Sequence, residues 1–342
     1  MSQLSVVILN YNGIDYLKKF LPSVVKSSLG HEVVVADNCS TDSSVSFLRE
    51  NFPDVRIICN TKNEGYSQGY NEALAQIKSK YYVLLNSDVE VTENWITPIL
   101  NQLEADPQIA AVQPKILDFN HKSQFEYAGA GGGIIDTLGY PFCRGRLFQT
   151  LEQDHGQYND THQVFWASGA CLFIRSDIFQ QAGGLDPDFF AHMEEIDLCW
   201  RINAMGYKVF YNGKSCVYHV GGGTLERTNP KKTYLNFRNG LSLLYKNYQR
   251  WELFLKLPLR IILDVVAAFK FMAFDGFYNG LAVFKAHLHF LLELPSNFKK
   301  RRTTKQLFKP VKIKSIYEGS LVWDYFIKGV RKYSELKVNN TK

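Results

Sequence analysis

The sequence lacks the signatures of several common protein classes. Its six cysteines include no CxxC pair and no set spaced with histidines as in a zinc site. It has no Walker A loop, no nucleic-acid-binding motif, no internal repeat and no low-complexity segment. These absences argue against a zinc protein, a P-loop enzyme and a nucleic-acid partner.

A membrane span and a signal peptide are also not expected. The chain has no uncharged apolar stretch of about 18 residues, the minimum for a spanning helix. Its first residues run directly into a strand-like segment, so no signal peptide is visible. Scattered cysteines without a secretion signal predict reduced thiols and a cytoplasmic location.

The composition is that of a globular chain with positive charge late in the sequence. Of 342 residues, 46% are hydrophobic and 21% charged, which suits one large or two ordinary domains. The net charge of +6 comes from Lys231, Lys232, residues 299–302 (KKRR) and further lysines up to Lys314. Two interpretations are open: a solvated charged tail, or a surface that meets membrane phosphates or a phosphorylated substrate.

The first hundred residues alternate short apolar runs with helical patterns. Strands are expected at residues 4–9, 32–36, 55–58 and 81–85, and helices at 16–27, 43–50 and 66–77. Strands joined through helices predict an α/β fold with parallel pairing and right-handed crossovers. In such sheets, ligands bind outside the carboxyl ends of the strands.

Polar residues follow all four of these predicted strands. The four segments are Asn10-Tyr11-Asn12, Asp37-Asn38, Asn63-Glu64-Gly65 and Asn86-Ser87-Asp88. Their common position predicts one polar rim at the carboxyl edge of the sheet. The last segment resembles a D-x-D element whose first acid is an amide, and a D-x-D element holds Mg²⁺ or Mn²⁺ against a diphosphate. The alternative for Asp88 is an ordinary solvated acid.

A second block runs from about residue 109 to residue 220. Strands are expected at 110–112, 164–166, 207–211 and 215–219, and a helix at 194–205. The glycines at 221–223, followed by Thr224, predict a flexible loop that can close over a ligand. A second glycine run, at 129–133, has no strand–helix context and does not predict a dinucleotide site.

The chain changes character beyond Pro230. Helices are expected at residues 232–248, 259–274 and 277–294, with wide apolar faces and narrow polar stripes. The stripes contain Arg260, Asp264, Lys270 and Asp275 in one helix and Lys285, His289 and Glu293 in the next. Two interpretations are open: helices packed on their own domain, or helices lying in a membrane interface. The apolar faces and the adjacent basic residues favour the membrane.

Seven ordered segments resemble those of glycosyltransferase family 2. They are VVILNYNG (6–13), DNCSTDSS (37–44), NEGYSQGYN (63–71), LLNSDVEV (84–91), WASGACLFIR (166–175), GGLDPDFFAHMEEIDLCWRINAMGYKV (183–209) and HVGGGT (219–224). The resemblance covers about residues 4–245 and is greatest to rhamnosyltransferase-like members that build bacterial surface polysaccharides. It implies the GT-A fold, with a mostly parallel central sheet.

The resemblance also implies roles for individual residues. Asp88 and His219 would hold Mg²⁺ or Mn²⁺, although a histidine before glycines also suits a purely structural role. The residues expected at the nucleotide and donor are Asn10, Asn12, Asp37, Asn63, Gly65, Gly69 and Asn86. Asp37 would bind the base or ribose; its alternative is a helix cap, a task that Ser40 or Asp42 can also serve.

The segment EEIDLCWR resembles the family block that carries the general base. The alignment points to Glu195, with Glu194 as the alternative, as the carboxylate that takes the proton of the acceptor hydroxyl. Asp197 and Arg201 are expected to form a structural ion pair, because they lie four residues apart on one helix. The acceptor or sugar pocket is expected at Trp166, Ser168 and Gly169, with a core position as the alternative for the tryptophan.

The sequence therefore predicts a GT-A domain at residues 1–230, with a nucleotide-binding half (1–105) and an acceptor-side half (106–230). Residues 231–342 form a helical, basic extension expected to contact a membrane peripherally. The predicted reaction is inverting transfer of a sugar from a nucleotide-diphospho-sugar, with dTDP-rhamnose as one candidate, to a hydroxyl of a glycan or lipid-linked acceptor. The predicted location is the inner face of the cell membrane.

Two rival functions follow from the same residues. A nucleotidyltransferase also uses a doubly wound sheet, but it opens with a glycine-rich basic loop that residues 6–13 do not resemble. A non-catalytic sugar-nucleotide-binding protein is favoured if the missing first acid of the D-x-D element abolishes metal binding. The sugar, the base, the linkage and the oligomeric state are left open.

Overall fold

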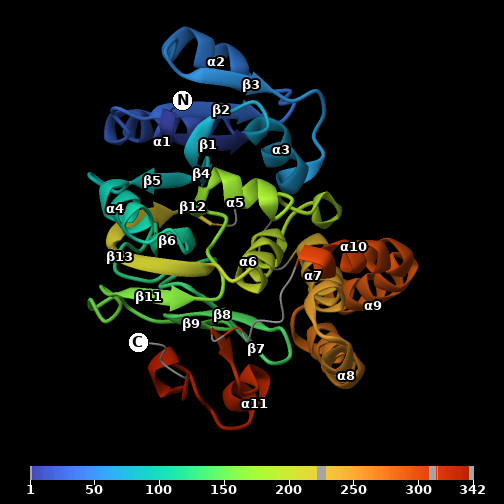
Figure 1. Ribbon diagram of the computed structural model, residues 1–342. Helices are drawn as coiled ribbons and strands as arrows, with labels where there is room; N and C mark the ends of the chain where they lie inside the picture. The colour runs from blue at the N-terminus through green and yellow to red at the C-terminus, as the bar shows by residue number, and fades with distance from the viewer. Residues whose placement is uncertain (1, 222–228, 308–312, 314, 339–342) are drawn as a thin grey trace.

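The computed structural model describes residues 2–221, 229–307, 313 and 315–338, and its centre is a nine-stranded sheet (Figure 1). The first half is parallel, with strand order β3-β2-β1-β4. Its strands are β1 (Ser2–Asn10), β2 (Glu32–Asp37), β3 (Arg56–Cys59) and β4 (Ser79–Asn86). The connecting helices are α1 (Ile14–Ser27), α2 (Ser44–Asn51) and α3 (Gly65–Leu74). The predicted α/β alternation is confirmed.

The second half of the sheet mixes strand directions. Strand β12 runs antiparallel to both β4 and β6, and β13 pairs in parallel with β6. The elements of this half are β5 (Val89–Val91), β6 (Ile109–Asp118), β11 (Thr161–Val164), β12 (Cys171–Arg175) and β13 (Lys208–His219). Two closing strands were expected where β13 runs as one strand. The register shift between Asn212 and Cys216 explains the interrupted apolar pattern.

A smaller five-stranded sheet packs beside the large one. It consists of β7 (Gly133–Asp136), β8 (Pro141–Cys143), β9 (Arg146–Leu147), β10 (Thr150–Leu151) and β14 (Ile316–Tyr317). Gly133 lies flat against the indole of Trp166, where a Cβ would come within 2.1 Å of the ring. Strand β14 pairs with β7, so the end of the chain returns to the α/β part. The adjoining helical segments are α11 (Leu321–Phe326) and η2 (Tyr333–Glu335).

The remaining helices cover the sheet and form a helical region at one side of the molecule (Figure 1). Those on the α/β part are α4 (Thr97–Ala105), α5 (Ser176–Gln181), η1 (Pro187–Phe189) and α6 (Glu194–Ala204). The helical region consists of α7 (Pro230–Asn247), α8 (Arg250–Phe274), α9 (Phe277–Leu292) and α10 (Leu294–Leu307). In the described part of the chain, no helix is both long and apolar enough to cross a membrane.

Candidate active site

Strand register brings the predicted donor residues to one edge of the sheet. Asn10 lies opposite Asp37 in the β1–β2 pair, and Leu9 lies opposite Asn86 in the β1–β4 pair. These strands are parallel, so their carboxyl ends coincide and the loops that follow them share one edge. The polar rim predicted from the sequence is therefore present.

Asp37 is buried at this edge and fully engaged by neighbouring donors. Its carboxylate accepts hydrogen bonds from Asn10 Nδ2 at 3.0 Å and from the Ser40 backbone N–H at 2.8 Å. The helix-cap alternative does not describe it, because Asp42 accepts from Ser44 N at the start of α2. Asp37 thus shapes the loop after β2 and does not cap a helix.

Asn12 joins the loops that follow β1 and β2. Its backbone adopts φ 50°, in the left-handed region that asparagine tolerates better than most residues. Its Oδ1 accepts from Thr41 N at 2.7 Å and from Asp42 N at 3.3 Å. The amide oxygen therefore holds the wall of the predicted nucleotide pocket.

Asn63, Gly65 and Gly69 lie at the start of α3, and protein groups fill the space beside both glycines. Asn63 Oδ1 accepts from Gly65 N at 2.9 Å. Gly65 has φ +89°, and a Cβ there would lie 2.5 Å from the ring of Phe190. A Cβ on Gly69 would lie 3.0 Å from the amide of Asn38. Positive φ and close packing require glycine at position 65, whereas at position 69 a larger residue would have to displace the Asn38 side chain.

Asp88 and His219 meet because β5 pairs with β13. Val89 lies opposite His219 in that pair, which places Asp88 Oδ1 3.1 Å from His219 Nε2. Asn86 Nδ2 lies 3.5 Å from the same ring nitrogen. The expected metal pair therefore comes from segments about 130 residues apart in the chain, at the end of β4.

Glu126 completes this cluster and was not predicted from the sequence. Its Oε2 lies 3.5 Å from His219 Nδ1 and accepts from Ala128 N at 2.5 Å. It lies in the loop between β6 and β7, among aromatic and glycine residues, and follows no strand end of the parallel half. No pattern in the sequence connects it with His219.

The two carboxylates determine the charge of His219. Burial alone would lower the pKa of His219, but Asp88 and Glu126 outweigh it and raise that pKa to about 10. Burial would likewise raise the pKa of Asp88, yet His219 and backbone donors hold it below its usual value. The cluster is thus an imidazolium between two carboxylates, an arrangement that a divalent cation can replace by displacing the proton.

The residues present fit a divalent cation that also binds a diphosphate. No group of three or more His, Cys, Asp or Glu side chains in metal-binding arrangement occurs among residues 2–221, 229–307, 313 and 315–338. Asp88 Oδ1 and His219 Nε2 nevertheless lie 3.1 Å apart, close enough for one cation to be bound by both. Such a two-ligand site suits Mg²⁺ or Mn²⁺ when substrate phosphates supply the other ligands.

In the first turn of α6, Glu194 is buried and Glu195 is half-buried, with its Oε2 enclosed. Burial raises the pKa of Glu195 to about 7, while the Glu195, Ile196 and Gly169 backbone groups limit the rise. Burial, followed by the charge of Glu195, raises the pKa of Glu194 well above its ordinary value. A carboxyl group with a pKa near neutrality suits a general base, so the chemistry of Glu195 agrees with its predicted role.

The loop before α6 is strained and is held by a side chain from α7. Phe190, His192 and Met193 all have φ between 62° and 72°. Asn239 Nδ2 lies 2.9, 3.0 and 2.7 Å from the carbonyl oxygens of Phe189, Ala191 and His192. This amide, which sequence analysis did not single out, fixes the backbone immediately before the two glutamates.

Helix α6 is also fixed by the predicted ion pair. Arg201 Nε lies 2.9 Å from Asp197 Oδ2, which confirms the pair. Asp197 further contacts Lys246 Nζ at 3.0 Å and Asn247 Nδ2 at 2.9 Å, both on α7. The helical region therefore holds the helix that carries Glu195.

The loop at 168–170 connects Glu195 with the end of β4. The Gly169 backbone donates to Glu195, while the Gly169 carbonyl accepts from Tyr66 Oη at 2.7 Å. The next carbonyl, of Ala170, accepts from Asn86 N at 3.0 Å. Short links thus join the candidate base to the strand end beside Asp88.

The acceptor-side residues are more enclosed than an open sugar pocket requires. Trp166 is 3% exposed, and its Nε1 donates to the Ile134 carbonyl at 2.9 Å. It therefore occupies a core position, the alternative that the sequence left open. Ser168 is also buried, and its N–H donates to Gln113 Oε1 at 2.8 Å. The tip of the predicted lid, residues 222–224, lies outside the described residues.

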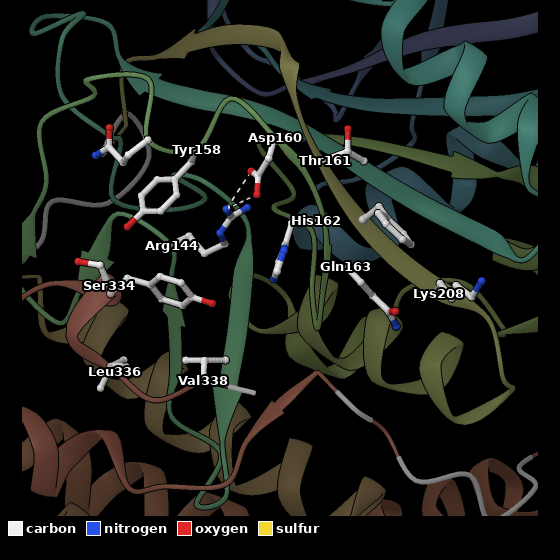
Figure 2. Close-up of a pocket in the computed structure, with 13 residues that line it drawn as sticks. Arg144, Tyr158, Asp160, Thr161, His162, Gln163, Lys208, Ser334, Leu336 and Val338 are labelled. Atoms are coloured by element: carbon white, nitrogen blue, oxygen red, sulfur yellow. Dashed lines mark hydrogen bonds and ion pairs between the residues drawn. The ribbon is translucent and has the colours of Figure 1, made fainter. Parts of the chain in front are cut away.

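The cavity of about 680 Å³ shown in Figure 2 lies away from this chemistry. It lies between β11 and the C-terminal segment that includes Tyr333, and none of the predicted site residues lines it. Lys208, at the start of β13, lines this cavity, whereas His219 is at the opposite end of the same strand. The Arg144–Asp160 ion pair at 2.8 Å forms part of its wall.

The half-parallel sheet, the carboxylate–histidine pair at the end of β4 and the glutamates at the start of α6 are features expected of a GT-A type sugar transferase. Comparison with known families gives the more specific assignment. The model of "Glycosyl transferase family 2" matches residues 5–182. The chain belongs to this family and is a glycosyltransferase.

Curated relatives and solved structures agree with this assignment. An N-acetylglucosaminyl-diphospho-decaprenol L-rhamnosyltransferase of Mycobacterium tuberculosis is 28% identical over 286 residues, which cover 75% of this chain and 91% of that protein. The rhamnosyltransferase WbbL of Escherichia coli K12 is 23% identical, covering 60% of this chain and 79% of that protein.

Two solved structures share the fold. GalNAc-T7 with UDP, GalNAc and Mn²⁺ superposes with a TM-score of 0.60 and 16% identity, covering 99% of this chain and 58% of that chain. The mannosyltransferase PcManGT of Pyrobaculum calidifontis, in complex with GDP-Man and Mn²⁺, gives a TM-score of 0.53 and 15% identity, covering 90% and 85%. At these identities the likeness is one of fold.

Proposed function

We propose that this protein is an inverting glycosyltransferase that moves a sugar from a nucleotide-diphospho-sugar to a hydroxyl of a lipid-linked glycan. Rhamnose from dTDP-rhamnose is the first donor to test, because both curated relatives described above are named rhamnosyltransferases. The diphospho-decaprenol in the name of the mycobacterial relative makes a polyprenyl-linked acceptor the first choice. We place the reaction at the inner face of the cell membrane.

The observation that carries the proposal is the pair of distinct carboxylate environments connected through the loop at 168–170. Asp88 is held ionised beside His219, whereas burial raises the pKa of Glu195 to about 7. An anionic carboxylate suits cation binding, and one that titrates near neutrality suits proton transfer. The two chemical tasks of glycosyl transfer are thus assigned to different residues.

Each residue then has a defined task in the proposed mechanism. Asp37 and Asn12 hold the loops that would bind the nucleoside, and Asp88 with His219 would hold Mg²⁺ or Mn²⁺. Such a cation neutralises the charge of the departing diphosphate. The oxygen of the acceptor hydroxyl attacks the anomeric carbon from the face opposite the departing diphosphate. Glu195 takes the proton of this hydroxyl.

A donor screen tests the transfer reaction. Purified protein is incubated with Mn²⁺, a lipid-linked glycan acceptor and one donor at a time among UDP-, dTDP- and GDP-sugars. We expect nucleoside diphosphate release and an acceptor heavier by one sugar with a single donor, dTDP-rhamnose first. A donor that binds without turnover in any combination would favour the non-catalytic binding protein.

Calorimetry with the matching nucleoside diphosphate tests the cation site separately. We expect Mn²⁺ to tighten diphosphate binding at least about tenfold in the wild type, and Asp88→Asn to remove this effect because it removes the anionic ligand. Glu90→Gln is the matched control, since Glu90 is the next acid along the chain and pairs with Lys122 at 2.5 Å. Equal Mn²⁺ enhancement in wild type and Asp88→Asn would refute the assignment.

A further inference from the structure

Helix α8 packs on the protein through its polar stripe. Arg260 and Asp264 are 4% and 0% exposed and form an ion pair at 2.8 Å. The Arg260 guanidinium also lies 4.0 Å from the centre of the Tyr140 ring and donates to the Leu138 and Gly139 carbonyls at 3.3 Å. Arg260 and Asp264 of the predicted stripe are therefore inside the fold, whereas Lys270 and Asp275 are exposed.

Two members of the second stripe, His289 and Glu293, also face the protein, whereas Lys285 is exposed. His289 Nδ1 lies 2.7 Å from Tyr234 Oη, and Glu293 pairs with Arg238 at 3.5 Å. Both partners are on α7. Both helices thus turn two residues of their polar stripes toward the protein, and their apolar faces point outward.

The outward face of α8 is a continuous apolar stripe. Leu255, Leu259, Ile262, Val266 and Phe269 are 46–61% exposed. Their spacing of four, three, four and three residues places them on one side of an α-helix. A surface helix of a water-soluble domain normally has the opposite arrangement.

Helix α9 repeats the same pattern. Phe277, Leu281, Phe284, Leu288 and Leu291 have the same spacing and are 36–59% exposed. Within the described residues, 16 of the 22 exposed large hydrophobic side chains lie between residues 251 and 298. So concentrated an apolar surface indicates a binding partner.

Charge identifies the partner. Residues 230–307 contain fourteen Lys and Arg residues against four Asp and Glu residues. Exposed cations near the apolar faces include Arg250, Lys270 and Lys285. A second copy would bring the same positive charge against itself, whereas an anionic bilayer offers both apolar chains and negative head groups.

Helix α10 shows which of the clustered basic residues can meet a head group. Lys300 pairs with Asp186 and with Asp188 at 2.6 Å, and Arg301 donates to the Tyr245 carbonyl. Lys299 and Arg302 are exposed instead, and with Phe298 they line a shallow hollow of about 270 Å³. Half of the predicted KKRR cluster therefore serves the fold, and the predicted cations beyond residue 307 to Lys314 lie outside the described residues.

We propose that the apolar stripes of α8 and α9, with Lys299 and Arg302 of α10, form a docking surface for an anionic lipid bilayer. The helices lie in the interface with their apolar faces in the acyl region. Lys299 and Arg302 contact lipid phosphates. This lipid-docking surface goes beyond the transfer reaction, because it needs neither donor, acceptor nor cation.

Vesicle flotation with the full-length chain tests the surface without any turnover. Vesicles of phosphatidylcholine alone are compared with vesicles that also contain phosphatidylglycerol. The apolar variant is Ile262→Ser/Val266→Ser/Leu288→Ser, and the charge variant is Lys299→Glu/Arg302→Glu. All five positions are exposed, so both variants are expected to keep the fold, which circular dichroism verifies.

We expect wild-type protein to float with the anionic vesicles, and the apolar variant to lose at least about tenfold in partitioning. The charge variant should bind anionic and neutral vesicles equally weakly. The matched control Lys26→Glu/Lys78→Glu makes the same charge change at exposed residues of the α/β part and should bind like wild type.

Three results would overturn the proposal. The first is no vesicle binding by wild type, and the second is unchanged binding by the apolar variant. The third is a wild-type dimer that the apolar variant converts to monomer while neither protein binds vesicles, which would assign the face to a second copy. Since flotation is independent of catalysis, failure here leaves the proposed transfer reaction intact.

Discussion

The α/β part and the helical region of this protein place their polar side chains in opposite ways. In the α/β part, apolar strands form the interior and polar groups such as Asp37 and Asp88 gather at one edge. In α8, the ion pair of Arg260 and Asp264 is inside and Ile262 and Phe269 are outside. Amphipathic segments thus form a polar rim in one region and an outward apolar surface in the other.

Helix α7 connects these two arrangements. Its Asn239 holds the loop before Glu195, and its Lys246 and Asn247 hold Asp197 on α6. The other side of α7 receives the polar stripe of α9. The region that presents an apolar face to its surroundings therefore also supports the helix of the candidate base.

The largest effect is expected where the α/β part performs chemistry. Glu195→Gln keeps the shape of the side chain but cannot take a proton, so turnover should fall about 10²–10⁴-fold with donor affinity unchanged. Product-release kinetics and calorimetry measure the two quantities. Glu194→Gln is the matched control, and a larger loss of turnover in that variant would transfer the role to Glu194.

The inward orientation of the polar side of α8 can be tested at the buried Arg260–Asp264 ion pair. Asp264→Ala leaves Arg260 as an uncompensated buried charge and should lower the free energy of unfolding by about 3–5 kcal/mol. Urea unfolding followed by tryptophan fluorescence measures the change. The double variant Arg260→Met/Asp264→Leu should recover most of the loss. A single-variant loss below about 1 kcal/mol would show that the pair behaves like an exposed one.

The connection between the two regions can be weakened at Asn239. Asn239→Ala leaves buried carbonyl groups unpaired and should lower the free energy of unfolding by about 1–3 kcal/mol. Because the loop positions Glu195, kcat should fall while donor affinity stays unchanged. The control is Asn297→Ala, which removes a buried amide bonded to Ser242 Oγ at 3.1 Å and should reduce stability alone. Equal kcat in both variants would make Asn239 purely structural.

The smallest effect concerns pH. Since burial raises the pKa of Glu195 to about 7 and the base must be ionised, kcat/KM should rise with pH and level off above about 7. At a pH between the ordinary glutamate pKa and about 7, the folded state binds more protons than the unfolded state. The contribution of Glu195 to the free energy of unfolding therefore falls as pH rises. Urea unfolding of wild type and Glu195→Gln from pH 5 to 8 should show wild type losing stability relative to the variant up to about pH 7, with a constant difference above it. A pH-independent difference would refute the raised pKa.

Much of the α/β part follows from local sequence patterns. The four parallel strands and the polar residues after them were predicted, because a buried strand reads as an apolar run and its end as a polar turn. The Asp197–Arg201 pair was predicted from helical spacing alone. Glu126 was missed because its contact with His219 joins two loops that have no periodic relation.

The sequence by itself determined the order of strands and helices, the family segments and the existence of a polar and an apolar face on α8 and α9. Periodicity defines such faces but carries no information about which one turns inward. The tertiary structure decided that, because the partners of Arg260 are Tyr140 and carbonyl groups more than a hundred residues away. The same holds for the meeting of Asp88 with His219, which depends on strand pairing between distant segments.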